Sequence, residues 1–187
     1  MLTRTSLLAL AFAFASTSFA QTALAPLDGS ERAKWLLREN LGPGALLENV
    51  AIGALSTLSN SPTEYGPHWE GFGKRVGLVT ANYGVQSVME VGLGSIWGED
   101  PRYDRTTGQP FKSRLGHAIK MTFLANYKSG GTKLAYGRLI AVPATSFAAN
   151  SWLPDSQSTA GDAAARAGLS MLSRMAENLF KEFRPHH

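Results

Sequence analysis

The sequence predicts an all-α protein, a compact bundle of five or six helices rich in glycine and alanine. Apolar residues recur at spacings of three and four, the period of an α-helix, between glycine, proline and capping residues. The 187-residue chain shows no strand-like alternation, no heptad run and no internal repeat. Several of its 19 glycines lie inside the helical segments, which favours close contact between helix backbones.

The first 20 residues have the three parts of a secretory signal peptide. Arg4 supplies the positive charge, residues 7–14 form an uncharged apolar core, and the small residues Ser18 and Ala20 precede the cleavage position. The core is shorter than the ~20 residues needed to span a bilayer. No cysteine follows it, which excludes lipoprotein attachment. We therefore expect an exported protein that begins near Gln21.

The remaining chain has the size of one domain. Residues 21–27 are predicted to be a flexible lead-in, and residues 28–185 a single helical domain. Because the chain contains no cysteine, packing rather than disulfides must stabilise the fold. Without Arg4 there are 17 basic and 14 acidic side chains, a net charge of +3. This excess is scattered and forms no nucleic-acid patch, but it permits a weak attraction to anionic lipid surfaces.

The helix boundaries follow from capping and breaking residues. Asp28 and Glu31 form a capping box for the first helix, and Gly42-Pro43-Gly44 ends it. Pro143 is predicted to kink or break the fifth helix. The predicted helices span residues 30–41, 45–58, 73–97, 112–127, 133–152 and 160–183, with an ordered loop at 60–71.

Two helices carry stripes of small residues, which we expect to face each other or a shared neighbour. Glycine in a helix costs up to about 1 kcal/mol relative to alanine, so such stripes need compensating contacts. A soluble bundle is the preferred interpretation, and packing within a bilayer is the alternative. The best apolar run, residues 139–154, is interpreted first as a buried helix and second as a membrane-embedded one. The stripes are Gly73, Gly77, Ala81, Gly84 and Val88, and Gly137, Ala141, Ala144 and Ala148.

The densest polar feature follows the third predicted helix. Pro101 disfavours helix at Asp100, so nearby carboxylates and guanidiniums are expected to fix a loop junction or to face a partner. The alternative is acid–base catalysis by Glu99 and Asp100 with His117. Asp100 and Asp104 could also hold a hard cation, but isolated histidines do not make a zinc site, and we predict no metal or cofactor. The predicted polar cluster comprises Glu99, Asp100, Arg102, Tyr103 and Asp104.

Several sequence blocks resemble a family of small exported bacterial proteins of unknown function. These blocks are Gly71-Phe72-Gly73-Lys74-Arg75, Glu99-Asp100-Pro101-Arg102-Tyr103, Trp152-Leu153-Pro154-Asp155 and Phe180-Lys181-Glu182-Phe183-Arg184-Pro185. The resemblance covers about residues 56–185 and implies a mostly helical exported protein. It implies no activity and no catalytic residues. Arg184 stands where an aromatic residue is common in that family.

Two function classes remain. The preferred hypothesis is a non-enzymatic envelope protein with a structural, peripheral membrane or assembly role, because no complete catalytic constellation is present. Such a protein is periplasmic or envelope-associated, either peripheral to a membrane or embedded in one, and its partner is an envelope protein or a membrane surface. The alternative is a small exported hydrolase or lyase that uses Glu99, Asp100 and His117.

Overall fold

The computed structural model describes residues 27–184, so the predicted signal peptide and most of the lead-in lie outside the described residues. Leu27, the last lead-in residue, is buried. The prediction of a helical bundle is confirmed, with a small sheet added. The α-helices are α1 (Gly29–Leu41), α2 (Pro43–Leu58), α3 (Trp69–Trp97), α4 (Phe111–Phe123), α5 (Tyr136–Ala148) and α6 (Ala160–Phe183). Short 3-10 helices are η1 (Thr63–Tyr65), η2 (Ala149–Ser151) and η3 (Asp155–Gln157).

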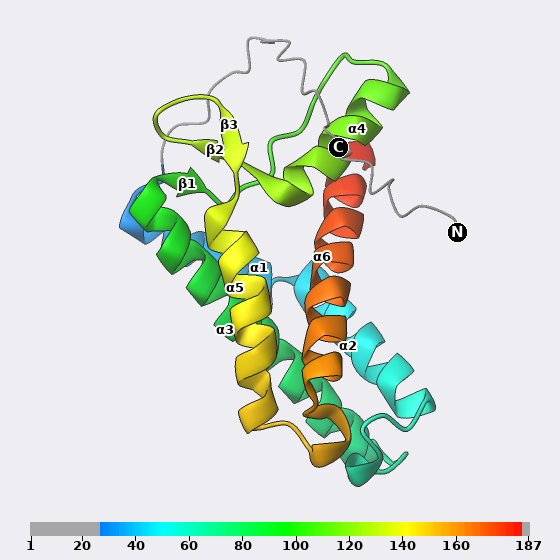
Figure 1. Ribbon diagram of the computed structural model, residues 1–187. Coiled ribbons are helices and arrows are strands. Elements are labelled where there is room, and N and C mark those ends of the chain that lie inside the picture. The colour runs from blue at the N-terminus through cyan, green and yellow to red at the C-terminus, as the bar shows by residue number, and fades with distance from the viewer. Residues whose placement is uncertain (1–26, 185–187) are drawn as a thin grey trace, which may run out of the picture.

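Helices α3, α5 and α6 run alongside one another, and α2 packs on α3 (Figure 1). At one end lie α4 and the strands β1 (Glu99–Asp100), β2 (Leu124–Tyr127) and β3 (Thr132–Leu134). We call this the sheet end. The opposite end, here the loop end, holds residues 59–68 and 149–159 (Figure 1). Here Ser156 donates a 2.7 Å hydrogen bond to Glu64, which ties the two loops together.

Local capping sets the helix starts. The Asp28–Glu31 capping box of α1 is present, as predicted. A second box, Thr159 with Asp162, starts α6 at the predicted residue. Helix α2 begins two residues earlier than predicted, because Pro43 occupies its first turn, where proline needs no hydrogen-bond partner.

The structure also contains strands, which the sequence pattern did not predict. Strand β2 pairs antiparallel with both β1 and β3, in the order β1-β2-β3. The fourth helix therefore ends at Phe123 instead of residue 127, and the fifth begins at Tyr136 instead of residue 133. Gly130 and Gly131 adopt φ of +87° and +77°, which allows the chain to turn back as a hairpin. Strands this short carry no readable alternation.

Helix α5 continues through Pro143, so the predicted break does not occur, and the helix gives way to η2 after Ala148. Pro143 is exposed. Its ring therefore displaces no neighbouring helix, and the proline costs the helix one backbone hydrogen bond.

The expectation for the first glycine stripe was also wrong. Gly73, Gly77, Ala81 and Val88 are exposed, and a Cβ placed on Gly77 or on Gly84 would meet nothing within 4 Å. The helix is rotated so that its polar arc, with Arg75 and Glu90, faces inward. Buried charged groups need polar partners inside the fold, which directs Arg75 and Glu90 inward. The stripe residues Gly73, Gly77 and Val88 lie two positions from one of these two, on nearly the opposite side of the helix, and therefore face outward.

Close backbone approach occurs elsewhere. A Cβ on Gly137 would lie 2.7 Å from the Glu90 carbonyl oxygen and 2.8 Å from the Gly94 nitrogen. Helices α3 and α5 thus cross at Gly94 and Gly137. Ala141, in the second predicted stripe, is fully buried, but Ala148 of that stripe is exposed.

The interior is small and polar. Arg75, Glu182 and Thr122 are the largest fully buried side chains of the described residues. Arg75 donates hydrogen bonds to loop-end carbonyl oxygens, at 2.9 Å to Ser61 and 2.6 Å to Pro62. Among residues 27–184, the buried apolar side chains larger than alanine are five: Leu27, Val91, Met121, Val142 and Leu153.

Candidate functional site

The predicted polar cluster begins where α3 ends. Gly98, with a φ of +77°, closes the helix in the left-handed conformation, and Glu99 and Asp100 follow as β1. Only 5% of Glu99 and 7% of Asp100 is exposed. Acidic side chains this deep require polar partners, and each of the two has its own.

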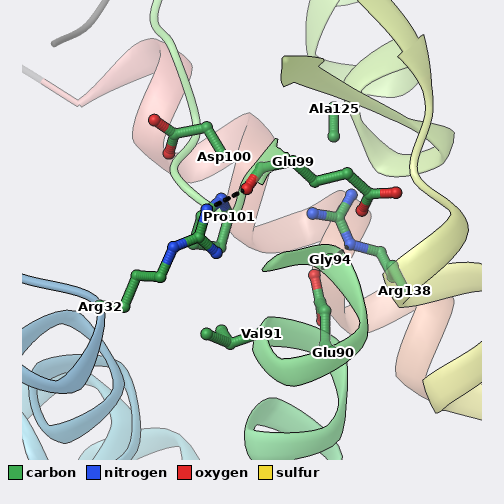
Figure 2. Close-up of a pocket in the computed structure, with 9 residues that line it drawn as sticks. All are labelled: Arg32, Glu90, Val91, Gly94, Glu99, Asp100, Pro101, Ala125 and Arg138. Carbon is green, nitrogen blue, oxygen red and sulfur yellow. Dashed lines mark hydrogen bonds and ion pairs between the residues drawn. The ribbon is translucent and has the colours of Figure 1, made fainter. Parts of the chain in front are cut away.

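Glu99 joins α3, β2 and α5. Its carboxylate accepts hydrogen bonds from the Gly137 backbone N–H at 3.1 Å and from the Tyr127 hydroxyl at 2.9 Å. Its carbonyl accepts a 2.7 Å bond from Arg32 Nη2 on α1 (Figure 2). Burial and the bond to Glu99 raise the pKa of Tyr127 above its usual value, so this phenol stays protonated.

Asp100 pairs with its neighbour Arg102. The Arg102 guanidinium contacts the carboxylate at 2.6 Å and 2.9 Å, and the Arg102 backbone N–H donates a further bond at 3.0 Å. The Asp100 side chain is 9% exposed and the Arg102 side chain 26%. The pair therefore closes the turn around Pro101 at a half-buried position.

The rest of the cluster attaches to the end of α6. The Tyr103 hydroxyl donates to Glu182 Oε2 at 2.7 Å, and Arg114 Nε of α4 contacts Glu182 Oε1 at 2.9 Å. Burial, followed by the bond to Glu182, raises the pKa of Tyr103 above its usual value. His117 Nε2 lies 2.8 Å from the Asp104 carbonyl oxygen. These contacts tie the 99–106 loop to α4 and α6.

The three residues of the acid–base alternative do not come together. Asp100 is paired with Arg102, Glu99 with Tyr127 and Gly137, and His117 with the Asp104 carbonyl. Among residues 27–184, no three His, Asp or Glu side chains gather as metal ligands.

A cavity of about 10 Å³ lies beside Glu99. Arg32, Glu90 and Arg138 are among the residues that line it (Figure 2). Arg32 Nη1 is buried without a hydrogen-bond partner among the described residues. The volume is at the lower limit for a single water molecule, too small for an organic substrate.

Sequence reasoning missed a chain of buried and half-buried charges through the bundle. Glu90 of α3 contacts Arg138 of α5 at 2.8 Å and Arg174 of α6 at 3.2 Å. The chain continues along α6 from Arg174 through Glu177 to Lys181, which reaches Glu39 of α1 at 3.0 Å. It links four helices and contains three acids and three bases, so its formal charges balance.

The outer surface is apolar. Among residues 27–184, 23 large apolar side chains are exposed, against the five that are buried. Examples are Leu58, exposed by 85%, Ile96 by 74% and Phe180 by 69%. They occur on every α-helix of the bundle. This distribution is the reverse of that in a water-soluble domain, where buried charged side chains are rare.

Helix α6 shows the reversal most clearly. Its exposed positions include Leu169, Leu172, Ala176 and Phe180, which recur at steps of three and four. Each of its charged side chains is buried or half-buried. Much of the apolar side of this helix therefore points outward.

One helical run among the described residues, Gly29–Leu58, is long and apolar enough to cross a membrane, and 11% of its most apolar window is buried. The run lies near the amino terminus and comprises α1 and α2, which meet at Gly42. A sequence signal for the reversal was available. On α6, Arg174 and Lys181 lie on the side opposite Leu172, so one of the two sides had to be inside.

No protein-family model, curated protein or solved structure matches this chain. The resemblance to a family of small exported proteins thus stays a prediction.

Proposed function

We propose that this protein is a non-enzymatic component of the cell envelope whose helical bundle is embedded in a lipid bilayer, where it has a structural or assembly role. One observation carries the proposal: on α3, α5 and α6 the exposed large apolar side chains outnumber the buried ones, while the charged side chains, apart from Glu70 and Lys74 at the start of α3, are buried or half-buried. Membrane helices direct ionisable residues to the bundle interior and pair them there.

Water is a poor surrounding for such a surface. Burying a large apolar side chain stabilises a protein by about 1.5–3 kcal/mol, and 23 of these side chains are left exposed. Contact with lipid acyl chains supplies the missing burial. A second copy of the chain is a weaker explanation, because one interface covers one side and the exposed residues surround the bundle.

The spacing of charges fits a bilayer. Between Arg75 and Glu99, α3 contains a single charged residue, Glu90, which is buried. At about 1.5 Å per residue this stretch is about 35 Å long, comparable to a hydrocarbon core of about 30 Å. Between Arg138 and Asp155 there is no charged residue at all.

Exposed aromatic residues mark both ends of two helices. Trp69 and Trp97 begin and end α3, and they are 83% and 42% exposed. Tyr136 begins α5 and Trp152 lies just beyond η2, each 45% exposed. Tryptophan and tyrosine are enriched where a membrane meets water, so these positions fit the two membrane–water interfaces of a bilayer. The hydrolase or lyase alternative has no comparable support, because Glu99, Asp100 and His117 have separate partners.

Membrane fractionation tests the proposal. The full chain, expressed with its export signal, is expected to stay in the membrane fraction after a high-salt wash. It is also expected to enter the detergent-rich phase in temperature-induced phase separation. A periplasmic protein processed in parallel is the control. Recovery of the folded protein from the periplasm as a detergent-free soluble monomer or oligomer would refute it.

A further inference from the structure

Charge is unevenly distributed between the two ends of the bundle. Residues 105–154 contain seven Lys and Arg side chains and no Asp or Glu. The basic excess looks scattered in sequence, but this stretch includes α4 and the β2–β3 hairpin, which lie together at the sheet end (Figure 1). The fold thus collects much of the positive charge at one end.

Among the basic side chains of this stretch, the lysines are the ones that face outward. Arg114 and Arg138 each pair with a buried glutamate. The four lysines are all exposed. They are Lys112 and Lys120 on α4, Lys128 in the hairpin turn and Lys133 on β3.

Among the described residues, no ion pair joins Lys112, Lys128 or Lys133 to a carboxylate. Glu99 and Asp100 are buried beneath the hairpin and Glu182 is buried under Arg114, while Asp104 is half-buried. The exposed acids of α1 and its cap, Asp28 and Glu31, lie on an element that also exposes Lys34 and Arg38.

The loop end has the opposite sign. Glu64, Glu70 and Asp155 are exposed there. The one lysine nearby, Lys74, pairs with Glu70 at 2.7 Å. The bundle therefore exposes more basic than acidic side chains at one end of its apolar surface and more acidic than basic ones at the other, where Arg75 is buried and Arg166 half-buried.

We propose that the sheet end binds the anionic headgroups of a phospholipid bilayer, so that the bundle enters the membrane in one orientation. This inference rests on the proposed function. Of these lysines, Lys128 donates its backbone N–H to the Gly98 carbonyl oxygen, next in sequence to Trp97. The rings of Trp97 and Tyr136 lie 6.0 Å apart at the junction of α3, α5 and the sheet. Lysines next to aromatic side chains at the edge of an apolar surface match the layered chemistry of phosphate, glycerol and acyl chain.

Vesicle flotation tests this proposal with the full chain purified in mild detergent. We expect the protein to bind phosphatidylglycerol-containing vesicles at least about tenfold more tightly than phosphatidylcholine vesicles at low salt. Each lysine near an anionic surface contributes about a fivefold gain, which salt screens. The preference should disappear when the four sheet-end lysines are changed to glutamine, and persist when they are changed to arginine.

Lys128→Gln removes one lysine at the sheet end, and Lys74→Gln, which removes one lysine at the loop end, is its matched control. Only Lys128→Gln should weaken the preference for phosphatidylglycerol-containing vesicles. Binding to neutral vesicles should be unchanged in the glutamine variant, because the apolar surface is intact. An equal preference in the glutamine variant, or none in the natural protein, overturns this proposal alone. No binding of either protein to any vesicle overturns the proposed function as well.

Discussion

Substituting one outward leucine distinguishes a lipid-facing surface from a water-facing one by the direction of the effect. Leu172 lies at the middle of α6, a helix of 24 residues, and is 59% exposed. In water, replacing an exposed leucine with lysine changes stability by less than about 0.5 kcal/mol. At the centre of a membrane helix, lysine costs about 2.5–3.5 kcal/mol and the lost leucine about 0.5 kcal/mol more. Leu172→Lys should therefore cost about 3–4 kcal/mol, a several-hundredfold loss in membrane partitioning.

The assay is flotation of the purified full chain with neutral vesicles, with bound protein measured across a lipid titration. Leu134→Lys is the matched control, because Leu134 is 45% exposed on β3, at the sheet end. That variant should bind neutral vesicles almost normally. If Leu172→Lys binds as well as the natural protein and melts at the same temperature, the lipid-facing assignment of α6 is wrong.

Four further substitutions test the interior, with Gly77→Ala as the exposed control among them. Glu90→Gln leaves two buried guanidiniums with reduced compensation and should cost about 3–5 kcal/mol in denaturant unfolding in detergent; a loss below about 1 kcal/mol would contradict the buried network. Gly137→Ala should cost about 1–3 kcal/mol by overpacking against α3, whereas Gly77→Ala should be neutral or stabilising by up to about 1 kcal/mol, and the reverse order in thermal melts would reject the observed rotation of α3. The raised pKa of Tyr127 means that the folded protein holds the phenol proton more tightly than the unfolded chain does. The contribution of this proton to the free energy of unfolding is therefore complete below pH 10.0 and declines above it. Tyr127→Phe should flatten that alkaline decline, as followed by circular dichroism; an unchanged decline would show that this phenol does not cause it.

Local chemistry was enough to predict that helices form and where several of them begin. The Asp28–Glu31 capping box starts α1, and α6 has the predicted bounds because capping residues and helical periodicity act within a few residues of each other. The polar loop after α3 was also predicted to depart from helix, because Pro101 restricts the residue before it.

Partners distant in sequence decided the rest. Residues 124–127 became a strand because β1 and β3 lie on either side of them, which no local pattern reveals. The burial of Glu90 depends on Arg138 and Arg174, which lie 48 and 84 residues away.

The sequence by itself determined that α3 and α6 each have a small or apolar side and a polar side. It did not determine which side faces inward, because a period of 3.6 residues shows only that two sides differ. The tertiary structure decided the rotation of each helix, through ion pairs that require Glu90, Arg138 and Arg174 to meet. Because buried charges need partners, this pairing fixes the polar sides of the helices inside the bundle. The apolar sides then face outward, where they require an apolar surrounding but no specific partner.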